Sequence, residues 1–149
     1  MSLSHQSIIV RLSRIFAERK MARFGVGFPE QTVLMFLANG AQIHQDAIAR
    51  HFMIDKGTIA KTIDKLEAKH LVTRQENPAN KREKLVALTP ASQGMLDEMQ
   101  QVLDDWEREL FQGVNDEDVE KYKEICQIMA ANAARTIEKS GSGNNGESD

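Results

Sequence analysis

The fold of this chain is decided by residues 43–66, which read IHQDAIARHFMIDKGTIAKTIDKL. A first helix is predicted from the apolar stripe made by Ala47, Ile48 and Phe52. Only three residues, 53–55, separate it from a second helical pattern, and the last of them, Asp55, is a good N-cap. Two helices joined by so short a turn predict a helix-turn-helix.

The second predicted helix has two faces. Ile59, Ile63 and Leu66 recur at i, i+4 and i+7, which predicts the face that packs on a core. A neighbouring face on helical geometry carries Thr58, Lys61, Thr62, Lys65 and Lys69. Hydroxyls bond base edges or phosphates, and lysines neutralise phosphates. The pattern therefore favours a helix in the major groove of DNA over the alternative of a solvated surface helix.

A basic hairpin is predicted directly after this helix. Residues 71–75 and 85–88 are rich in Val, Leu and Thr, which is typical of short antiparallel strands, and residues 77–80, Asn-Pro-Ala-Asn, favour a turn. Arg82 is placed in a minor groove or against phosphates because its planar fork suits both. The alternative is a solvated tip. The remaining cations predicted to contact DNA are Lys56, Arg74, Lys81 and Lys84.

These segments resemble the multiple-antibiotic-resistance regulator (MarR) family of dimeric winged-helix transcription factors. The resemblance extends from about residue 7 to residue 137 and is most specific over residues 43–89. The matching stretches are Gln31–Leu34, Gln45–Ala49, Ile54–Ile59, Ile63–Glu67, Asn77–Arg82 and Leu88-Thr89. The resemblance implies a mainly α fold with a minor β part, in which long N- and C-terminal dimerisation helices carry a winged helix-turn-helix.

Two positions depart from the family pattern. Asn80 stands where the family usually has an aspartate two residues before the key wing arginine. Its amide can still hydrogen-bond Arg82 or the backbone, but it offers no charge pairing. Ser92 stands where the family places a glycine, and Gly94 follows two residues later. Neither change removes a predicted DNA contact.

Helical patterns also flank the helix-turn-helix. Apolar residues recur at helical spacing in the N-terminal segment, at Ile8, Leu12, Ile15 and Phe16. Further helices are predicted to begin at Phe28-Pro29, at Thr89-Pro90 and after a cap at Asn115. We predict a dimerisation helix over 1–27, a DNA-binding domain over 28–90, C-terminal dimerisation helices over 91–139 and a disordered tail over 140–149.

The long amphipathic helices have little of their own chain to pack against. This predicts a two-fold homodimer in preference to a monomeric helical cap. A dimer would set two recognition helices roughly 34 Å apart, one turn of DNA, so a pseudo-palindromic operator is expected.

The charge is unevenly distributed along the 149 residues, whose formal net charge is −3. Residues 1–43 and 44–90 each have a balance of +3, whereas residues 91–149 carry five Lys/Arg against fourteen Asp/Glu. Such asymmetry suits a protein whose basic side meets DNA. The single cysteine, Cys126, favours a reducing cytoplasm. The sequence predicts neither an export signal nor a membrane span.

The resemblance also implies repression that is relieved by a small aromatic or phenolic ligand in a crevice between the dimer helices and the winged helix. Candidate lining residues are Arg11, Arg14, Phe16, Phe36 and Trp106, for which interface packing and surface charge are the alternatives. Redox-sensing members usually carry a cysteine in the first helix, which is absent here, so Cys126 is interpreted as an inert thiol on an apolar stripe.

No pattern indicates a metal, a cofactor or an enzyme. The histidines at 44, 51 and 70 are scattered, and no glycine-rich phosphate loop or nucleophile motif occurs. The leading hypothesis is a homodimeric, sequence-specific DNA-binding transcriptional regulator, most simply a repressor. The alternative is a winged helix whose basic face docks on an acidic protein. Thr58 and Thr62 among the lysines favour base reading over plain electrostatic attraction.

Overall fold

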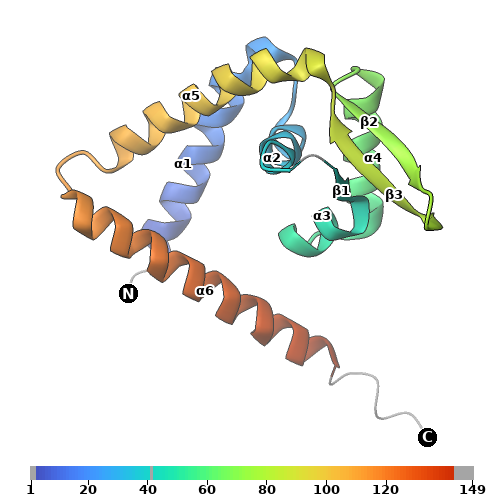
Figure 1. Cartoon of the computed structure of the whole chain (residues 1–149). Helices are drawn as coiled ribbons and strands as arrows, with labels where there is room; N and C mark the ends of the chain where they lie inside the picture. Colours follow the sequence, from blue (N-terminus) through green and yellow to red (C-terminus); the bar gives the residue numbers. More distant parts are fainter. Residues whose placement is uncertain (1–2, 41, 143–149) are drawn as a thin grey trace, which may run out of the picture. The chain divides into compact units, whose positions relative to one another are not determined.

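A computed structural model describes residues 3–40 and 42–142 (Figure 1). The elements follow in the order α1 (Leu3–Met21), η1 (Ala22–Phe24), α2 (Phe28–Leu37), β1 (Ile43–His44), α3 (Gln45–Phe52), α4 (Lys56–Ala68), β2 (Val72–Asn77), β3 (Asn80–Leu88), η2 (Pro90–Ser92), α5 (Gln93–Leu110) and α6 (Asp116–Ser142). The predicted mainly α fold with a small β part is confirmed.

The helix-turn-helix forms where the sequence predicts it. Helix α3 ends at Phe52, and the chain turns into α4 at its C-cap, Met53, whose φ of 53° is left-handed. Asp55 caps α4, because its Oδ1 accepts from the backbone N–H of Thr58 at 2.8 Å. A side-chain acceptor at this position satisfies one of the unpaired amides of the first turn. The cap therefore fixes where α4 starts.

The sheet has the order β1-β3-β2, and all pairs are antiparallel. Strands β2 and β3 pair from Val72 opposite Leu88 to Asn77 opposite Asn80, so the hairpin is longer than predicted. Its tight turn is supported by Asn77, whose Oδ1 accepts from the N–H of Ala79 at 3.0 Å. This hairpin is the wing, and β2 packs against α4.

The hydrophobic core draws one side chain or more from nearly every element up to α5. Met21, Leu34, Ile63, Val86 and Met99 come from α1, α2, α4, β3 and α5, and each is at most 1% exposed. The end of α1 and the start of α5 are therefore part of the winged-helix core. The chain divides into two compact units, residues 1–107 and 108–149.

Two predicted helix ends are corrected. Pro90 begins the 3₁₀ turn η2, and α5 starts only at Gln93, because the Thr89 hydroxyl donates to the carbonyl of His70 at 2.8 Å instead of capping a helix. Helix α6 continues through residues 140–142, which were assigned to the disordered tail. The remainder of that tail, residues 143–149, lies outside the described residues.

Helix α6 is the main element of the second unit. Asn115 caps it as predicted, with Oδ1 accepting from the N–H of Asp118 at 2.9 Å. Over residues 108–141, for which side-chain exposure is described, no side chain is buried. The exposed apolar side chains of α6 are Tyr122, Ile125, Ile128 and Ile137. No helix in the described part of the chain is long and apolar enough to cross a membrane.

Candidate nucleic-acid interface

The outward face of α4 carries Thr58, Lys61 and Lys65, which are all exposed. Neither lysine forms a hydrogen bond or an ion pair with another described residue. Thr58 also donates its hydroxyl to Asp55 Oδ2 at 2.6 Å. The hydrogen bonds from the Thr58 hydroxyl and backbone hold the pKa of Asp55 below its usual value of 3.8. This face presents two uncommitted ammonium groups beside an oriented hydroxyl.

Thr62 does not lie on that exposed face, contrary to the predicted grouping. The residue is only 6% exposed, and its hydroxyl donates to the carbonyl of Thr58 at 3.1 Å. Thr62 lies three residues after Ile59 and four before Leu66, both of which are in the core. It therefore joins the apolar stripe of α4 with its only donor satisfied inside the helix.

Lys69 is committed within the protein. Its Nζ donates to Glu30 Oε2 at 2.5 Å and to the carbonyl of Gly25 at 2.7 Å. The Glu30 side chain is 9% exposed, whereas that of Lys69 is 40% exposed. The predicted grouping of Lys69 with Lys61 and Lys65 is therefore corrected, because this ammonium faces the start of α2.

Arg74 is likewise turned inward, from β2 of the wing onto α4. Its Nη2 donates to Asp64 Oδ1 at 2.6 Å and to the carbonyl of Ala60 at 3.4 Å, and its side chain is 19% exposed. A guanidinium that holds a carboxylate and a carbonyl of the same helix joins the two elements. Arg74 thus fixes the wing against α4. Its Nη2 group is occupied by Asp64 and Ala60 and does not point towards DNA in the proposed arrangement.

Two further predicted cations form ion pairs at the surface. Lys56 Nζ lies 3.1 Å from Asp46 Oδ2, and Lys84 Nζ lies 3.2 Å from Glu76 Oε1. At least one partner in each pair is 60% exposed or more, so each pair contributes at most about 1 kcal/mol. Phosphate can replace such partners at little cost.

The wing tip, residues 77–82, carries the remaining predicted cations. Lys81 and Arg82 are exposed, and neither side chain forms an ion pair with another described residue. Asn80 Oδ1 accepts from the backbone N–H of Arg82 at 3.2 Å. The asparagine therefore orders the backbone of the tip and leaves the guanidinium of Arg82 uncommitted.

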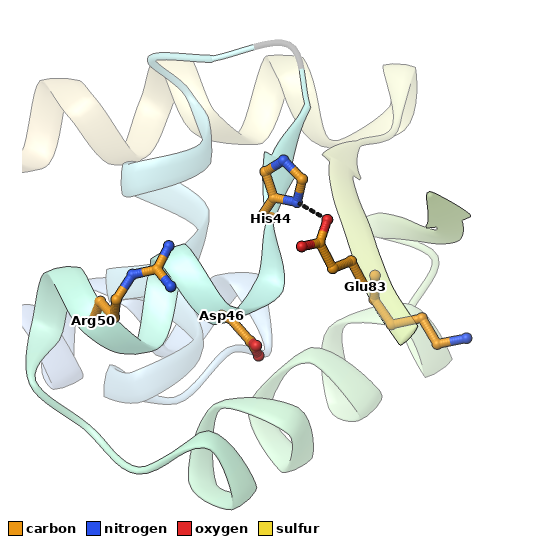
Figure 2. A pocket seen from close by; sticks show the side chains of 5 residues that line it. His44, Asp46, Arg50 and Glu83 are labelled. Carbon is orange, nitrogen blue, oxygen red and sulfur yellow. Dashed lines mark ion pairs between the residues drawn. The ribbon is translucent and has the colours of Figure 1, made fainter. Parts of the chain in front are cut away.

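A polar pocket of about 210 Å³ lies beside the wing, and the sequence did not predict it. Figure 2 shows His44 of β1 facing Glu83 of β3, with Asp46 and Arg50 on α3. His44 Nδ1 lies 3.3 Å from Glu83 Oε2, which also accepts from Asn77 Nδ2 at 2.9 Å. The His44–Glu83 contact ties the wing to the start of the helix-turn-helix, and the Asn77–Glu83 bond lies within the wing. The signal in the sequence was weak, because β1 has only two residues.

A larger apolar cavity, of about 320 Å³, lies between α1, α2, α3 and α5. Its described lining residues are Ala17, Met21, Phe28, Gln31, Thr32, Met35, Phe36, Phe52 and Leu103. None of these residues is charged. Helix α2 supplies most of the wall.

Of the five residues predicted to line a ligand crevice, only Phe36 is among those that line this cavity. Phe16 instead stacks on Trp106 with ring centroids 4.4 Å apart, and Trp106 Nε1 donates to Ser13 Oγ at 2.9 Å. Arg14 pairs with Glu18 at 2.9 Å, and Arg11 is exposed. The aromatic pair is a packing contact between α1 and α5.

Other chemistry finds little support in the described residues. They contain no group of three or more His, Cys, Asp or Glu side chains placed to hold a metal ion. Cys126 is half-buried on α6, and its hydrogen bond with Tyr122 raises the pKa of that tyrosine.

A short-turn pair of helices, a cationic outer face on the second and a hairpin pinned to it define a winged helix-turn-helix protein. The MarR family model matches residues 29–84. The crystal structure of MarR is 26% identical, covers 93% of this chain and 95% of its own, and superposes with a TM-score of 0.80. A MarR transcriptional regulator from Methanosarcina mazei Go1 is also 26% identical, with 89% and 96% covered and a TM-score of 0.82.

Residues 29–84 are therefore similar to the MarR family, and the chain shares the winged-helix fold of MarR and of a MarR transcriptional regulator. A third similar structure, the S. aureus MepR–DNA complex, is 21% identical with 89% and 98% of the chains covered. Its TM-score of 0.79 shows that the fold is shared.

Proposed function

We propose that this regulator binds operator DNA as a homodimer and that α4 reads the major groove while the wing tip follows the backbone. The observation that carries the proposal is the two-sidedness of α4. Ile59, Ile63 and Leu66 are at most 2% exposed, whereas Lys61 and Lys65 are exposed and unpaired on the opposite side. Such a helix is fixed from behind and presents its cations outward, which suits a polyanionic groove.

The available cations divide into two sets. Lys61, Lys65, Lys81 and Arg82 are unpaired with other described residues, and Lys56 and Lys84 are held only by surface pairs. These six supply the phosphate contacts of the proposal. Base reading falls to Thr58, because Thr62 is buried. The S. aureus MepR–DNA complex supports this use of the shared fold.

The dimer is supported by apolar side chains that the single chain leaves exposed. On α1 these are Ile8, Ile9, Val10 and Leu12, and on α6 they are Tyr122, Ile125, Ile128 and Ile137. Exposed apolar residues in such number on two helices mark an interaction surface. A second copy of the chain buries them in a two-fold assembly, so the operator is pseudo-palindromic.

The regulator acts as a repressor that a small aromatic or phenolic ligand releases from DNA. The apolar cavity beside α2 supports a ligand of this kind, because its volume of about 320 Å³ is at the lower end of small-molecule pockets. Gln31 and Thr32 are its polar lining residues, and both side chains already donate to backbone carbonyls. The cavity therefore favours a ligand that binds chiefly through its ring.

The decisive experiment is a gel shift of the purified full chain on DNA flanking its coding region. We expect preference for this DNA over random duplex by a factor of at least about a thousand at ~150 mM salt. Equal binding to the flanking DNA and to random duplex would contradict the proposal and favour the alternative of a protein-docking module. Addition of single aromatic acids to the complex tests release, and a ligand that binds also raises the melting temperature of the free protein.

A further inference from the structure

The Glu30–Lys69 ion pair joins two elements that are far apart in the sequence. Glu30 lies in the first turn of α2, and Lys69 is the C-cap of α4. The Glu30 carboxylate is nearly buried, accepts from Lys69 Nζ at 2.5 Å and accepts more weakly from the backbone N–H of Gly27 at 3.4 Å. A buried carboxylate is stable only when it is paired, so Lys69 is the group that makes Glu30 tolerable at this position.

The same ammonium also reaches the turn before α2. Lys69 Nζ donates to the carbonyl of Gly25 at 2.7 Å, and Gly25 has a left-handed φ of 68°. The next residue of this turn is held too, because Gln31 Nε2 donates to the carbonyl of Val26 at 3.1 Å. The turn and the first residues of α2 thus form one hydrogen-bonded block, and among the described contacts Lys69 is the only α4 side chain that hydrogen-bonds to it.

The position of Lys69 on α4 determines what this link can control. The next residue, His70, has a left-handed φ of 57° and leads into β2. The link therefore sits where the recognition helix ends and the wing begins. A shift of Lys69 would move both elements relative to the core.

We infer that Lys69 is a positioning residue, which fixes the C-terminal end of α4 through its ion pair with Glu30 and acts on DNA binding without touching DNA. The inference rests on the proposed function. Under this inference, the buried acidic residue Glu30 strengthens the binding of operator DNA, although both are negatively charged. Simple electrostatic attraction predicts the opposite sign, because loss of a negative charge strengthens binding to DNA.

The test compares Lys69→Gln with Lys65→Gln, a matched lysine one turn earlier on α4 that has no partner among the described residues. Operator affinity is measured from about 50 to 200 mM salt. We expect Lys69→Gln to weaken binding about tenfold with an unchanged salt slope. We expect Lys65→Gln to lower the slope by about 1, as loss of one phosphate contact does.

Glu30→Gln supplies the sign test, and it should weaken operator binding although it removes a negative charge. The double variant Glu30→Gln/Lys69→Gln should bind better than Lys69→Gln alone, since it leaves no unpaired buried carboxylate. Lys69→Arg should restore most of the affinity. In the absence of DNA, amide hydrogen exchange should accelerate at Leu71 and in the first turn of α2 for Lys69→Gln but not for Lys65→Gln.

A salt slope that falls by about 1 in Lys69→Gln, or tighter binding by Glu30→Gln, would overturn the inference and make Lys69 a phosphate contact. The double variant and Lys69→Arg keep the test decisive if a single variant folds poorly. A wild-type protein without operator preference would instead defeat the proposed function, and the two failures are therefore distinguishable.

Discussion

Helices α4 and α6 expose faces of opposite chemistry. The inner face of α4 is buried in the core, and its outer face carries Thr58, Lys61 and Lys65. Helix α6 is twice as long, at 27 residues against 13, yet within its described residues it buries no side chain and exposes isoleucines. Helix α4 is packed by its own chain and exposes charged side chains. Helix α6 has no buried side chain within its described residues and exposes apolar ones.

This difference separates two kinds of dependence on a partner. The structure of α4 rests on its own core, so the proposed DNA partner is needed for its function and not for its folding. The apolar face of α6 gains stability only when something covers it, because exposed apolar area contributes nothing to folding until it leaves water. Substitutions in the two helices should therefore affect different measurements.

The largest effect is expected from a core truncation in α4. Ile63 is 0% exposed, so Ile63→Ala should lower the free energy of unfolding by about 2–5 kcal/mol through lost burial and a residual cavity. Ile128→Ala, the same truncation on α6 at a residue 60% exposed, should cost the monomer less than about 0.5 kcal/mol. Urea unfolding at low protein concentration measures both, and equal losses would remove the distinction between the helices.

The next effect concerns association. Ile128→Asp places a charge on the apolar face of α6, so it should raise the dimer dissociation constant by roughly tenfold or more. Gln127→Asp, at an exposed neighbouring position of the same helix, should leave it nearly unchanged. Sedimentation velocity over a concentration series gives the result. Dimers of wild-type strength in both variants would show that this face of α6 is not the interface.

A smaller effect distinguishes the lysines of the two helices. Lys61→Ala should weaken operator binding and lower its salt slope by about 1, since one phosphate contact is lost. Lys121→Ala, an exposed lysine on α6, should leave the slope unchanged. Thr62→Val should leave sequence preference intact, because that side chain is buried. Altered preference in Thr62→Val would restore the original prediction for this residue.

The smallest effect concerns the two N-caps. Asp55→Ala should lower the melting temperature by roughly a few degrees near pH 7. The folded-state pKa of Asp55 is depressed, so its contribution is fully present above about 3.8 and is lost as pH falls through the folded value. Asn115→Ala removes a cap with no titrating group on its accepting oxygen. The difference in melting temperature between the wild type and Asp55→Ala should therefore narrow as the pH falls from about 7 towards the folded pKa, whereas the difference for Asn115→Ala should not.

Local patterns in the sequence were enough to predict the helix-turn-helix, the hairpin and both N-caps. The cap at Asp55, the turn at 77–80 and the spacing of Ile59, Ile63 and Leu66 each involve residues a few positions apart. Thr62 lies three residues after Ile59, beside the same apolar stripe, so its burial also follows from local spacing.

The ion pairs of Lys69 and Arg74 within the protein could not be predicted from local patterns. Lys69 pairs with a residue 39 positions earlier, and Arg74 pairs across the bend between α4 and β2. The stacking of Phe16 on Trp106 likewise joins helices at opposite ends of the first unit. A lysine or arginine on a predicted face can bind DNA or a carboxylate equally well, and only tertiary packing decides between them.

The Arg74–Asp64 contact has a consequence for engineering. Because β2 is fastened to α4 by a guanidinium that is 19% exposed, α4 and the wing form one unit that should be transferred together. Grafting the corresponding helix of a similar winged-helix protein alone would replace Asp64 or leave Arg74 facing a foreign surface. Under the proposed function, a change of operator should therefore exchange residues 55–88 together.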